Sequence, residues 1–494
     1  MKTLSLLLAL ILCVLSIAAF GEAGAGAPEG MPRGAAGEMP QGGPGGNPPD
    51  LREGGMGGPG GGPGSAAQPD TYQAVIEAAD VREIDGETVA STGTDENAIW
   101  VNGGELTLTG SEIVRVSGDS SGGDSASFYG VGAAILATDG TADISGVAID
   151  TDARGGAGIF AWGDAVIAAD SCAIRTVQDA SGGIHVAGGG TLYASNLDVT
   201  TEGGSSAAIR SDRGGGIMVV DGGTYTSGGI GSPAVYVTAD ITIHGAELTA
   251  TGSEALCLEG RNSVRLYDCV LSGDMPENEQ NDTTWNVILY QSMSGDSEVG
   301  KGSFEMVGGK LISNSGGVFY TTNTESSFVI SGVEIEAQEG AYLLRAAGNR
   351  NSRGWGTAGS NGADCVFTAI DQEMAGDVQW DSISALDLYL LEGSAWSGAF
   401  VQDESCAGEG GDGGAVLTID ESSCWIVTGN SALTTLMNAG AIVDQQGNPV
   451  TVVLRDGDVA AEGTSEYTVT VEDYFAEADT DGAGSVSEWE DYAV

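Results

Sequence analysis

Between Ile184 and Ala255 the chain repeats one short pattern three times. The first copy contains three alternating runs, Ile184-His185-Val186, Leu192-Tyr193-Ala194 and Leu197-Asp198-Val199, separated by Gly, Asn, Asp or Ser residues. Alternation of apolar and polar residues with a period of two predicts β-strands, and the small polar residues between the runs predict tight turns. Three strands per copy without a crossover helix predict a chain that winds round and stacks on itself.

The repeat extends far beyond this window. The apolar centres of the third run are 23 to 26 residues apart at six of eight steps, and polar insertions lengthen the other two steps. These centres are Ile113, Ile149, Ile174, Val199, Tyr225, Leu248, Leu271, Leu311 and Ile335. Five and seven residues before each centre stands another apolar residue, so stacked coils would bury continuous columns. We therefore predict an all-β fold, a right-handed parallel β-helix with three-strand coils of about 23–26 residues.

Composition divides the chain into four regions. Residues 1–21 resemble a secretory signal peptide, because a basic residue precedes an apolar run that ends in small residues. Residues 22–70 contain nine of the twelve prolines and long glycine runs, which predicts a disordered linker. Residues 71–454 form the predicted β-helix, with a cap at 71–89 and regular coils at about 97–340. Residues 455–494 are a predicted C-terminal strand and cap segment.

The charge balance limits the partners that the chain can have. Seventeen basic and 70 acidic residues give a formal net charge of −53, which argues against nucleic acid and anionic membranes as partners. Phe20 occupies the position where a lipoprotein signal would need a cysteine, so we expect no lipid anchor. We expect a secreted or cell-surface protein with no transmembrane segment after signal cleavage.

Six cysteines follow the signal peptide. Cys172 and Cys269 fall in the same inward column four coils apart, roughly 19 Å at the spacing of paired strands, which is too far for a disulfide. We expect both to be buried as small apolar residues. The sequence leaves open one bridge among Cys257, Cys365, Cys406 and Cys424.

The residues expected to point outward from the first strands form an aromatic and basic column. This column reads Trp100, Leu136, Phe160, His185, Arg210, Tyr236, Phe319 and Leu343. The outward column of the second strands is more polar and reads Thr107, Asp143, Ala168, Tyr193, Val219, Thr242, Arg265 and Glu305. An aromatic stripe on a solenoid is a possible glycan track, because sugar rings stack on aromatic faces. The alternative is that loops, the linker or a second chain cover the stripe.

Two groups of residues are candidates for a site. The first group lies on three successive coils and combines one His, two Arg and two Asp with a tryptophan: Trp162, Asp164, His185, Arg210, Asp212 and Arg213. An enzyme of the β-helix polysaccharide lyase or hydrolase type would use Asp164, His185, Arg210 and Asp212. No spacing motif fixes these residues together, so no catalytic residue is assigned.

The second group lies in the polar insertion at 345–362, where Arg350, Arg353 and Trp355 could bind an anionic sugar or a partner's carboxylate. The alternative is that these arginines bind no ligand and only neutralise the charge of neighbouring acidic coils. The predicted ligand-binding set from both groups is Trp100, Phe160, Trp162, His185, Arg210, Tyr236, Arg350, Arg353 and Trp355.

No cofactor is expected, although calcium is possible near the C-terminus. Residues 479–490 nearly fit a calcium-binding loop, with Ala483 at a position where a liganding side chain is expected. Only one copy is present, and too little chain follows for a full second helix.

The chain carries a family resemblance that covers about residues 97–453 and is most specific in the C-terminal half. The runs Val366-Phe367-Thr368-Ala369-Ile370, Leu386-Asp387-Leu388-Tyr389-Leu390 and Ser423-Cys424-Trp425-Ile426-Val427-Thr428-Gly429-Asn430-Ser431 resemble secreted right-handed parallel β-helix proteins of anaerobic bacteria. They are also similar to the passenger β-helices of autotransporter adhesins. The resemblance implies an extracellular or surface location and an adhesin-like role, with no agreed catalytic residues. Since no membrane barrel follows Val494, we expect release from the cell or non-covalent attachment to it.

The function predicted from the sequence is adhesion, with an extracellular polysaccharide or a host or cell-surface glycan as the ligand. Two other classes stay open, a β-helix polysaccharide lyase or hydrolase and a purely structural surface protein. An enzyme would need a deep groove over His185 and Arg210, whereas a binding protein would need only a shallow aromatic strip.

Overall fold

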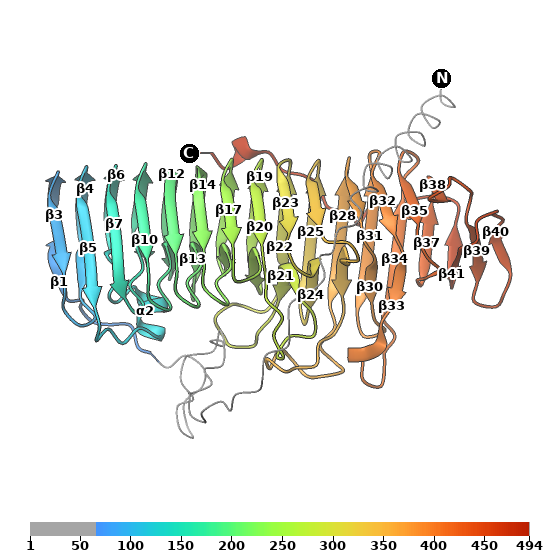
Figure 1. The fold of residues 1–494 in the computed structure, drawn as a ribbon, viewed down its shortest axis with the longest axis horizontal. Coiled ribbons are helices and arrows are strands. Elements are labelled where there is room, and N and C mark those ends of the chain that lie inside the picture. Colours follow the sequence, from blue (N-terminus) through green and yellow to red (C-terminus); the bar gives the residue numbers. More distant parts are fainter. Residues whose placement is uncertain (1–65, 494) are drawn as a thin grey trace, which may run out of the picture.

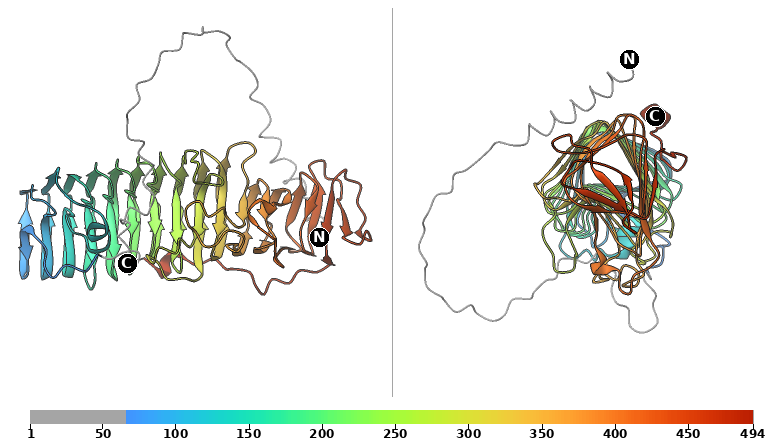
Figure 2. Two further views of the ribbon diagram at one scale, coloured as in Figure 1. Left: turned by 90° about the horizontal axis from the view of Figure 1, so that it is seen from below. Right: turned by 90° about the vertical axis from the view of Figure 1, so that its right-hand side faces the viewer.

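The computed structural model describes residues 66–493, and the predicted signal peptide and most of the predicted linker lie outside these residues. Parallel strands stack side by side along one axis and form a long solenoid (Figure 1). Seen along its axis, the solenoid is a tube with the chain wound round its wall (Figure 2). The prediction of an all-β, parallel β-helix fold is confirmed.

Each coil contributes strands to three sides, which we call the first, second and third sheets in chain order. The first sheet contains β1 (Ala74–Ala78), β8 (Ile159–Trp162), β11 (Ile184–Ala187), β13 (Ile209–Ser211), β15 (Val235–Val237), β18 (Leu256–Glu259), β21 (Trp285–Tyr290), β24 (Gly317–Thr322), β27 (Leu344–Ala346), β30 (Val378–Trp380) and β33 (Phe400–Gln402). The second sheet contains β2 (Val81–Asp85), β9 (Val166–Asp170), β16 (Asp240–His244), β19 (Ser263–Tyr267), β22 (Gly302–Val307), β25 (Glu325–Ser331), β28 (Asp364–Ile370), β31 (Ala385–Leu391), β34 (Gly414–Ile419), β37 (Thr435–Asn438) and β42 (Asp473–Phe475).

The third sheet contains β3 (Thr88–Ser91), β5 (Glu112–Ser117), β7 (Ala148–Ala153), β10 (Ala173–Thr176), β17 (Glu247–Ala250), β20 (Val270–Gly273), β23 (Lys310–Ser313) and β26 (Glu334–Ala337). A four-stranded ladder of β29 (Glu373–Ala375), β32 (Ala395–Gly398), β35 (Cys424–Val427) and β38 (Ala441–Asp444) follows it in the later coils. Four longer strands serve two sheets each. β4 (Asn97–Thr109) and β6 (Ile135–Ser145) run from the first into the second, and β12 (Gly190–Thr201) and β14 (Gly216–Ser227) run from the second into the third.

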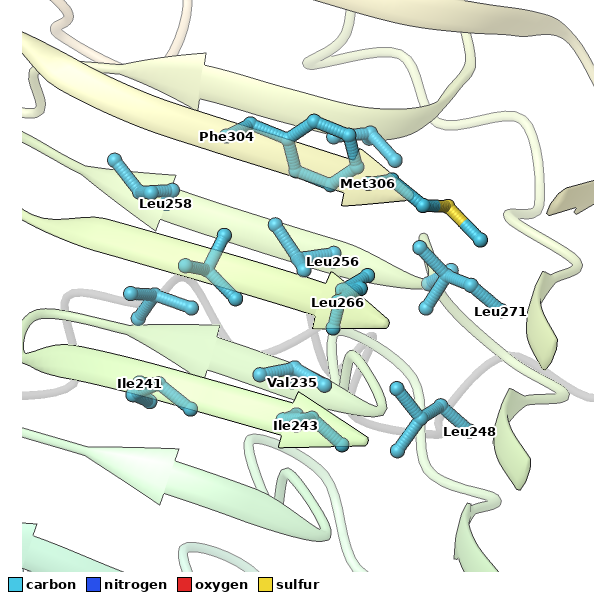
Figure 3. Packing of buried hydrophobic residues seen from close by; sticks show 14 of the residues in the cluster. Val235, Ile241, Ile243, Leu248, Leu256, Leu258, Leu266, Leu271, Phe304 and Met306 are labelled. Carbon is cyan, nitrogen blue, oxygen red and sulfur yellow. The ribbon is translucent and has the colours of Figure 1, made fainter. Parts of the chain in front are cut away.

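The interior of the tube is filled by the apolar columns that the sequence predicts. All nine predicted third-strand centres, from Ile113 to Ile335, pair with one another in register. Figure 3 shows how inward side chains of the three sheets meet, with Leu256, Leu266 and Leu271 in one coil above Val235, Ile243 and Leu248 in the coil before it. Because a single coil exposes this inner face, stacking of neighbours is what removes it from water.

Two residues of the predicted outward column point inward instead. Phe319 packs against Phe304, Phe328 and Phe367 in the core, and Leu343 belongs to the same core cluster. The outward position of β24 is therefore Tyr320, which pairs with Arg345 of β27. A shift of one residue along a strand moves a side chain to the opposite face, which explains the error at Phe319. Leu343 lies just before β27, whose outward position is Arg345.

The coils begin earlier and end later than the predicted range of 97–340. The segment predicted to be an N-terminal cap forms β1, β2 and β3, a complete coil that pairs with the next one. At the other end, β36 (Ser431–Ala432), β39 (Thr451–Leu454), β40 (Val459–Ala461) and β41 (Thr468–Val471) form a separate sheet that covers the last coil. Pairing there turns antiparallel between β39 and β40, which ends the stack and blunts its edge.

Short helices occur only in loops of the described residues: α2 (Asp124–Tyr129), η1 (Glu404–Cys406) and η2 (Trp489–Asp491). None of the helices between residues 66 and 493 has the length and apolar character that a membrane span requires. The insertions that the sequence shows leave the coils at the edges of the first sheet, and their contacts define the candidate sites.

Candidate functional site

The predicted outward column of the first sheet exists, but it is covered. Trp100, Leu136, Phe160, His185, Arg210 and Tyr236 pair in register along neighbouring strands. Phe160 is 0% exposed and His185 1%, while Trp100, Arg210 and Tyr236 are also buried. The structure therefore has loops over this stripe rather than an open aromatic strip.

The insertion after β5 supplies much of this cover. It carries α2, whose Ser127 Oγ accepts a hydrogen bond of 2.9 Å from Arg210 Nη2. The ring of Phe128 lies 4.2 Å from the guanidinium of Arg213, and the ring of Tyr129 lies 6.1 Å from that of Trp162. Helix α2 thus fixes the side chains of two later coils from outside.

Beneath α2 lies a buried triad of His185, Arg210 and Asp212. Asp212 Oδ2 lies 3.0 Å from His185 Nε2 and 2.7 Å from Arg210 Nε. Burial lowers the pKa of His185 to about 4, although Asp212 opposes the shift. Burial alone would raise the pKa of Asp212, but Arg210 and His185 together hold it below its usual range. The triad is a neutral histidine beside a compensated carboxylate–guanidinium pair.

The remaining members of the sequence group lie apart from the triad. Asp164 is exposed at the turn after β8, and no hydrogen bond or ion pair joins it to the triad within the described residues. Trp162 is half-buried under Tyr129. Three of the four residues that an enzyme would use thus come together, and they do so out of contact with solvent.

The second predicted group forms where two insertions meet. Arg350 pairs with Asp282 through its guanidinium, and its backbone N–H donates to the same carboxylate at 2.8 Å. Arg353 Nε donates to Asn281 Oδ1 at 2.5 Å, and its guanidinium lies 5.6 Å from the ring of Trp355. The arginines of one insertion therefore bind the polar side chains of the other, and Asp282 neutralises Arg350.

A small cavity of about 40 Å³ lies beside Arg353 and Trp355, with Glu254, Cys257 and Trp285 among its walls. Trp355 is buried against Tyr290 and Trp285, at ring distances of 4.4 and 6.1 Å. Trp285 Nε1 is buried without a hydrogen-bond partner among the described residues. The volume has room for roughly three waters, so this cavity suits a small polar group rather than a sugar ring.

Near this cavity lies a buried carboxyl group that the sequence analysis missed. Glu259 Oε2 accepts from Tyr236 Oη and Tyr290 Oη at 3.2 Å each, and Oε1 accepts from the Ser292 backbone at 3.3 Å. Burial is the main cause of a raised pKa for Glu259. The residue interrupts an otherwise apolar run, Leu256-Cys257-Leu258-Glu259, and that was the available signal.

The outer face of the second sheet, by contrast, carries an open groove of about 380 Å³. Strands β4, β6, β9, β12 and β14 form its floor. Hydroxyl and carboxylate side chains line it at Thr107, Thr109, Asp143, Ser145, Asp170, Ser195 and Asp221, together with Ala168, Tyr193 and Val219. The predicted second outward column, from Thr107 through Asp143 and Tyr193 to Glu305, is confirmed by the strand register.

Two aromatic rings border this groove. Tyr193 is half-buried between Ala168 and Val219, its neighbours on the adjoining strands, both of which are smaller. Trp489 comes from the C-terminal segment and stacks on His244 at 4.7 Å with an interplanar angle of 13°. His244 Nδ1 in turn lies 2.7 Å from Asp221 Oδ1, so a groove residue helps to position the tryptophan.

The C-terminal residues that resemble a calcium loop lie on this face. They contain turns and η2, without a helix on either side of a loop. No group of three or more His, Cys, Asp or Glu side chains with metal-binding geometry occurs in the described part of the chain. The six cysteines between residues 66 and 493 are all buried, and no disulfide joins any two of them, so the bridge left open by the sequence is absent.

No protein-family model, no curated protein and no solved structure matches this chain.

Proposed function

We propose that this is a secreted or cell-surface, adhesin-like protein that binds a neutral glycan along the groove of the second sheet. The observation that carries the proposal is the composition of the groove, which combines hydroxyl and carboxylate side chains with the half-exposed rings of Tyr193 and Trp489. Aromatic faces stack on sugar rings, and the polar side chains can form hydrogen bonds with the hydroxyl groups of the bound glycan.

Charge favours a neutral glycan over an acidic one. Asp143, Asp170 and Asp221 line the groove, and no basic side chain does so within the described residues. A sugar hydroxyl can donate to each carboxylate, whereas a uronate would be repelled by these groups and by the formal net charge of −53. Strands repeat at about 4.8 Å along the groove, close to the length of one sugar unit, so an extended glycan can meet each coil alike.

The resemblance to secreted β-helix proteins and autotransporter passengers is part of this proposal and supports the extracellular location. A polysaccharide lyase or hydrolase centred on His185 is a weaker candidate, since that histidine is only 1% exposed beneath α2. A purely structural role is favoured by the covered first sheet, which leaves little aromatic surface on that side.

A glycan array and a polysaccharide-cleavage assay on the mature protein at physiological salt test the proposal. We expect binding to neutral glycans, weak or no binding to uronate-containing glycans, and no cleavage. Cleavage that disappears in His185→Gln would overturn the proposal in favour of the enzyme. Silence in both assays would overturn it in favour of the structural role.

A further inference from the structure

The groove does not end where its open part ends. The two outward columns of the second sheet continue in register through β16, β19, β22, β25, β28 and β31, as in the series Val219, Thr242, Arg265, Glu305, Val329, Thr368 and Tyr389. Over these six strands the face is covered by the last residues of the chain. Figure 2 shows this segment running back along the outside of the solenoid, and the C-terminus lies beside much earlier coils (Figure 1). We call residues 476–493 the strap.

Polar contacts fix the middle of the strap. Gly484 N donates to Thr368 Oγ1 at 2.9 Å, and Ser487 N donates to Glu305 Oε1 at 2.6 Å. Ser487 Oγ also bonds Glu305, at 2.8 Å to Oε2, and lies 2.7 Å from Tyr267 Oη. The glycines permit a close approach, because a β-carbon at Gly484 would clash with Val329.

Aromatic contacts fix the end of the strap. Trp489 stacks on His244, and the guanidinium of Arg265 lies 4.5 Å from the ring of Tyr492. Tyr267 lies 6.2 Å from Trp489 and 6.4 Å from Tyr492, measured between ring centroids. The strap therefore binds this face with an aromatic ring over the columns and hydrogen bonds to polar side chains, the same chemistry that we propose for a glycan in the open part.

No ion pair neutralises the negative charge of the strap within the described residues. It carries six carboxylates, Glu477, Asp479, Asp481, Glu488, Glu490 and Asp491, and no basic residue. No ion pair joins it to the rest of the described chain, and none of its residues is buried. Because the whole protein is strongly acidic, repulsion opposes the attachment of the strap.

We infer that the strap is a displaceable cover over the C-terminal half of one long glycan-binding face. This inference rests on the proposed function. The open groove spans five strands and matches about five sugar units, whereas the complete face spans eleven strands and matches about eleven. A short glycan binds beside Trp489 with the strap in place, and a longer one must displace the strap to gain further contacts.

The test compares neutral xylo-, manno- and gluco-oligosaccharides of four and ten units by calorimetry. In the full-length Gly484→Ala/Ser487→Ala variant, which loosens the middle of the strap and leaves Trp489 and its stack on His244 unchanged, affinity for the ten-unit oligomer should rise on the order of tenfold. Affinity for the four-unit oligomer should not change. Glu490→Ala, at an exposed strap residue without a contact to the body, is the matched control and should behave as wild type.

Hydrogen exchange gives a second readout that needs no variant. The ten-unit oligomer should accelerate exchange of the Gly484 and Ser487 amides, and the four-unit oligomer should not. If oligomers bind but the double variant shows the wild-type length dependence, the strap inference is wrong and the proposed function stands. If no neutral oligomer binds any of the three proteins, the proposed function fails and the inference fails with it.

Discussion

Acid should destabilise the protein through His185. Its pKa falls from 6.5 to about 4 on folding, because the imidazolium would be buried beneath α2. A histidine with a lowered folded pKa contributes stability that is fully present above 6.5 and is lost as the pH falls toward 4. At about 1.4 kcal/mol per pH unit, the loss across this window is roughly 3 kcal/mol.

Denaturant unfolding at intervals between pH 4 and 7 measures this loss when wild type is compared with His185→Gln. The glutamine does not titrate and still offers a donor to Asp212, so the difference between the two proteins should shrink or reverse toward pH 4. His244→Gln serves as the control, because His244 lies partly exposed on the other face. Because the chain has two histidines, the His244→Gln variant retains only His185, and its NMR signal is assigned without ambiguity. A His185 signal that titrates near 6.5, or a stability difference that is constant with pH, would refute the reasoning.

Three further outcomes follow from the interior and its cover. Burial raises the pKa of Glu259 above its ordinary value of 4.5, so this carboxyl group costs stability as the pH rises from 4.5 toward its raised pKa. Glu259→Gln should therefore gain stability relative to wild type as the pH rises in the same denaturation series, and a difference that is constant with pH would contradict this. Phe328→Ala should cost about 3–5 kcal/mol, since its ring packs against three other phenylalanines, whereas Phe475→Ala, 44% exposed, should cost about 0.5 kcal/mol or less. A thiol reagent should leave all six described cysteines unmodified in the native protein and label all six after unfolding without reductant; labelling of only four would indicate a disulfide.

The coil architecture was predictable because alternation is unambiguous where one face of a strand is polar. The run Leu197-Asp198-Val199 can place only its apolar residues inward, and the third-strand column was confirmed along its whole predicted length. The run Val318-Phe319-Tyr320 does not show which residues point inward, since β24 is buried on both faces. A register error of one residue arose there.

The sequence contains an indication that the first sheet is covered, and the prediction gave this indication too little weight. An outward column that includes Trp100, Leu136 and Phe160 would expose a long apolar stripe, which soluble proteins seldom do. The identity of the cover depended on loops that return from other coils, and α2 reaches Arg210 across 83 positions of sequence. No local pattern encodes such a contact.

The groove was half predictable. Its floor followed from the polar outward column of the second strands, including Tyr193. Its aromatic end wall did not, because Trp489 lies in a segment without periodicity and reaches His244 through the strap.

The most direct test of the account is the affinity of Tyr193→Ala for the strongest neutral glycan identified on the array. Tyr193 contributes an aromatic face to the groove, and loss of stacking should weaken binding by about 1–2 kcal/mol, or roughly tenfold. Tyr193→Phe, which keeps the ring, and Asp198→Asn, an exposed carboxylate of the third sheet outside the groove, should retain wild-type affinity. Wild-type affinity in Tyr193→Ala, with the fold intact, would contradict the placement of the glycan on the second sheet.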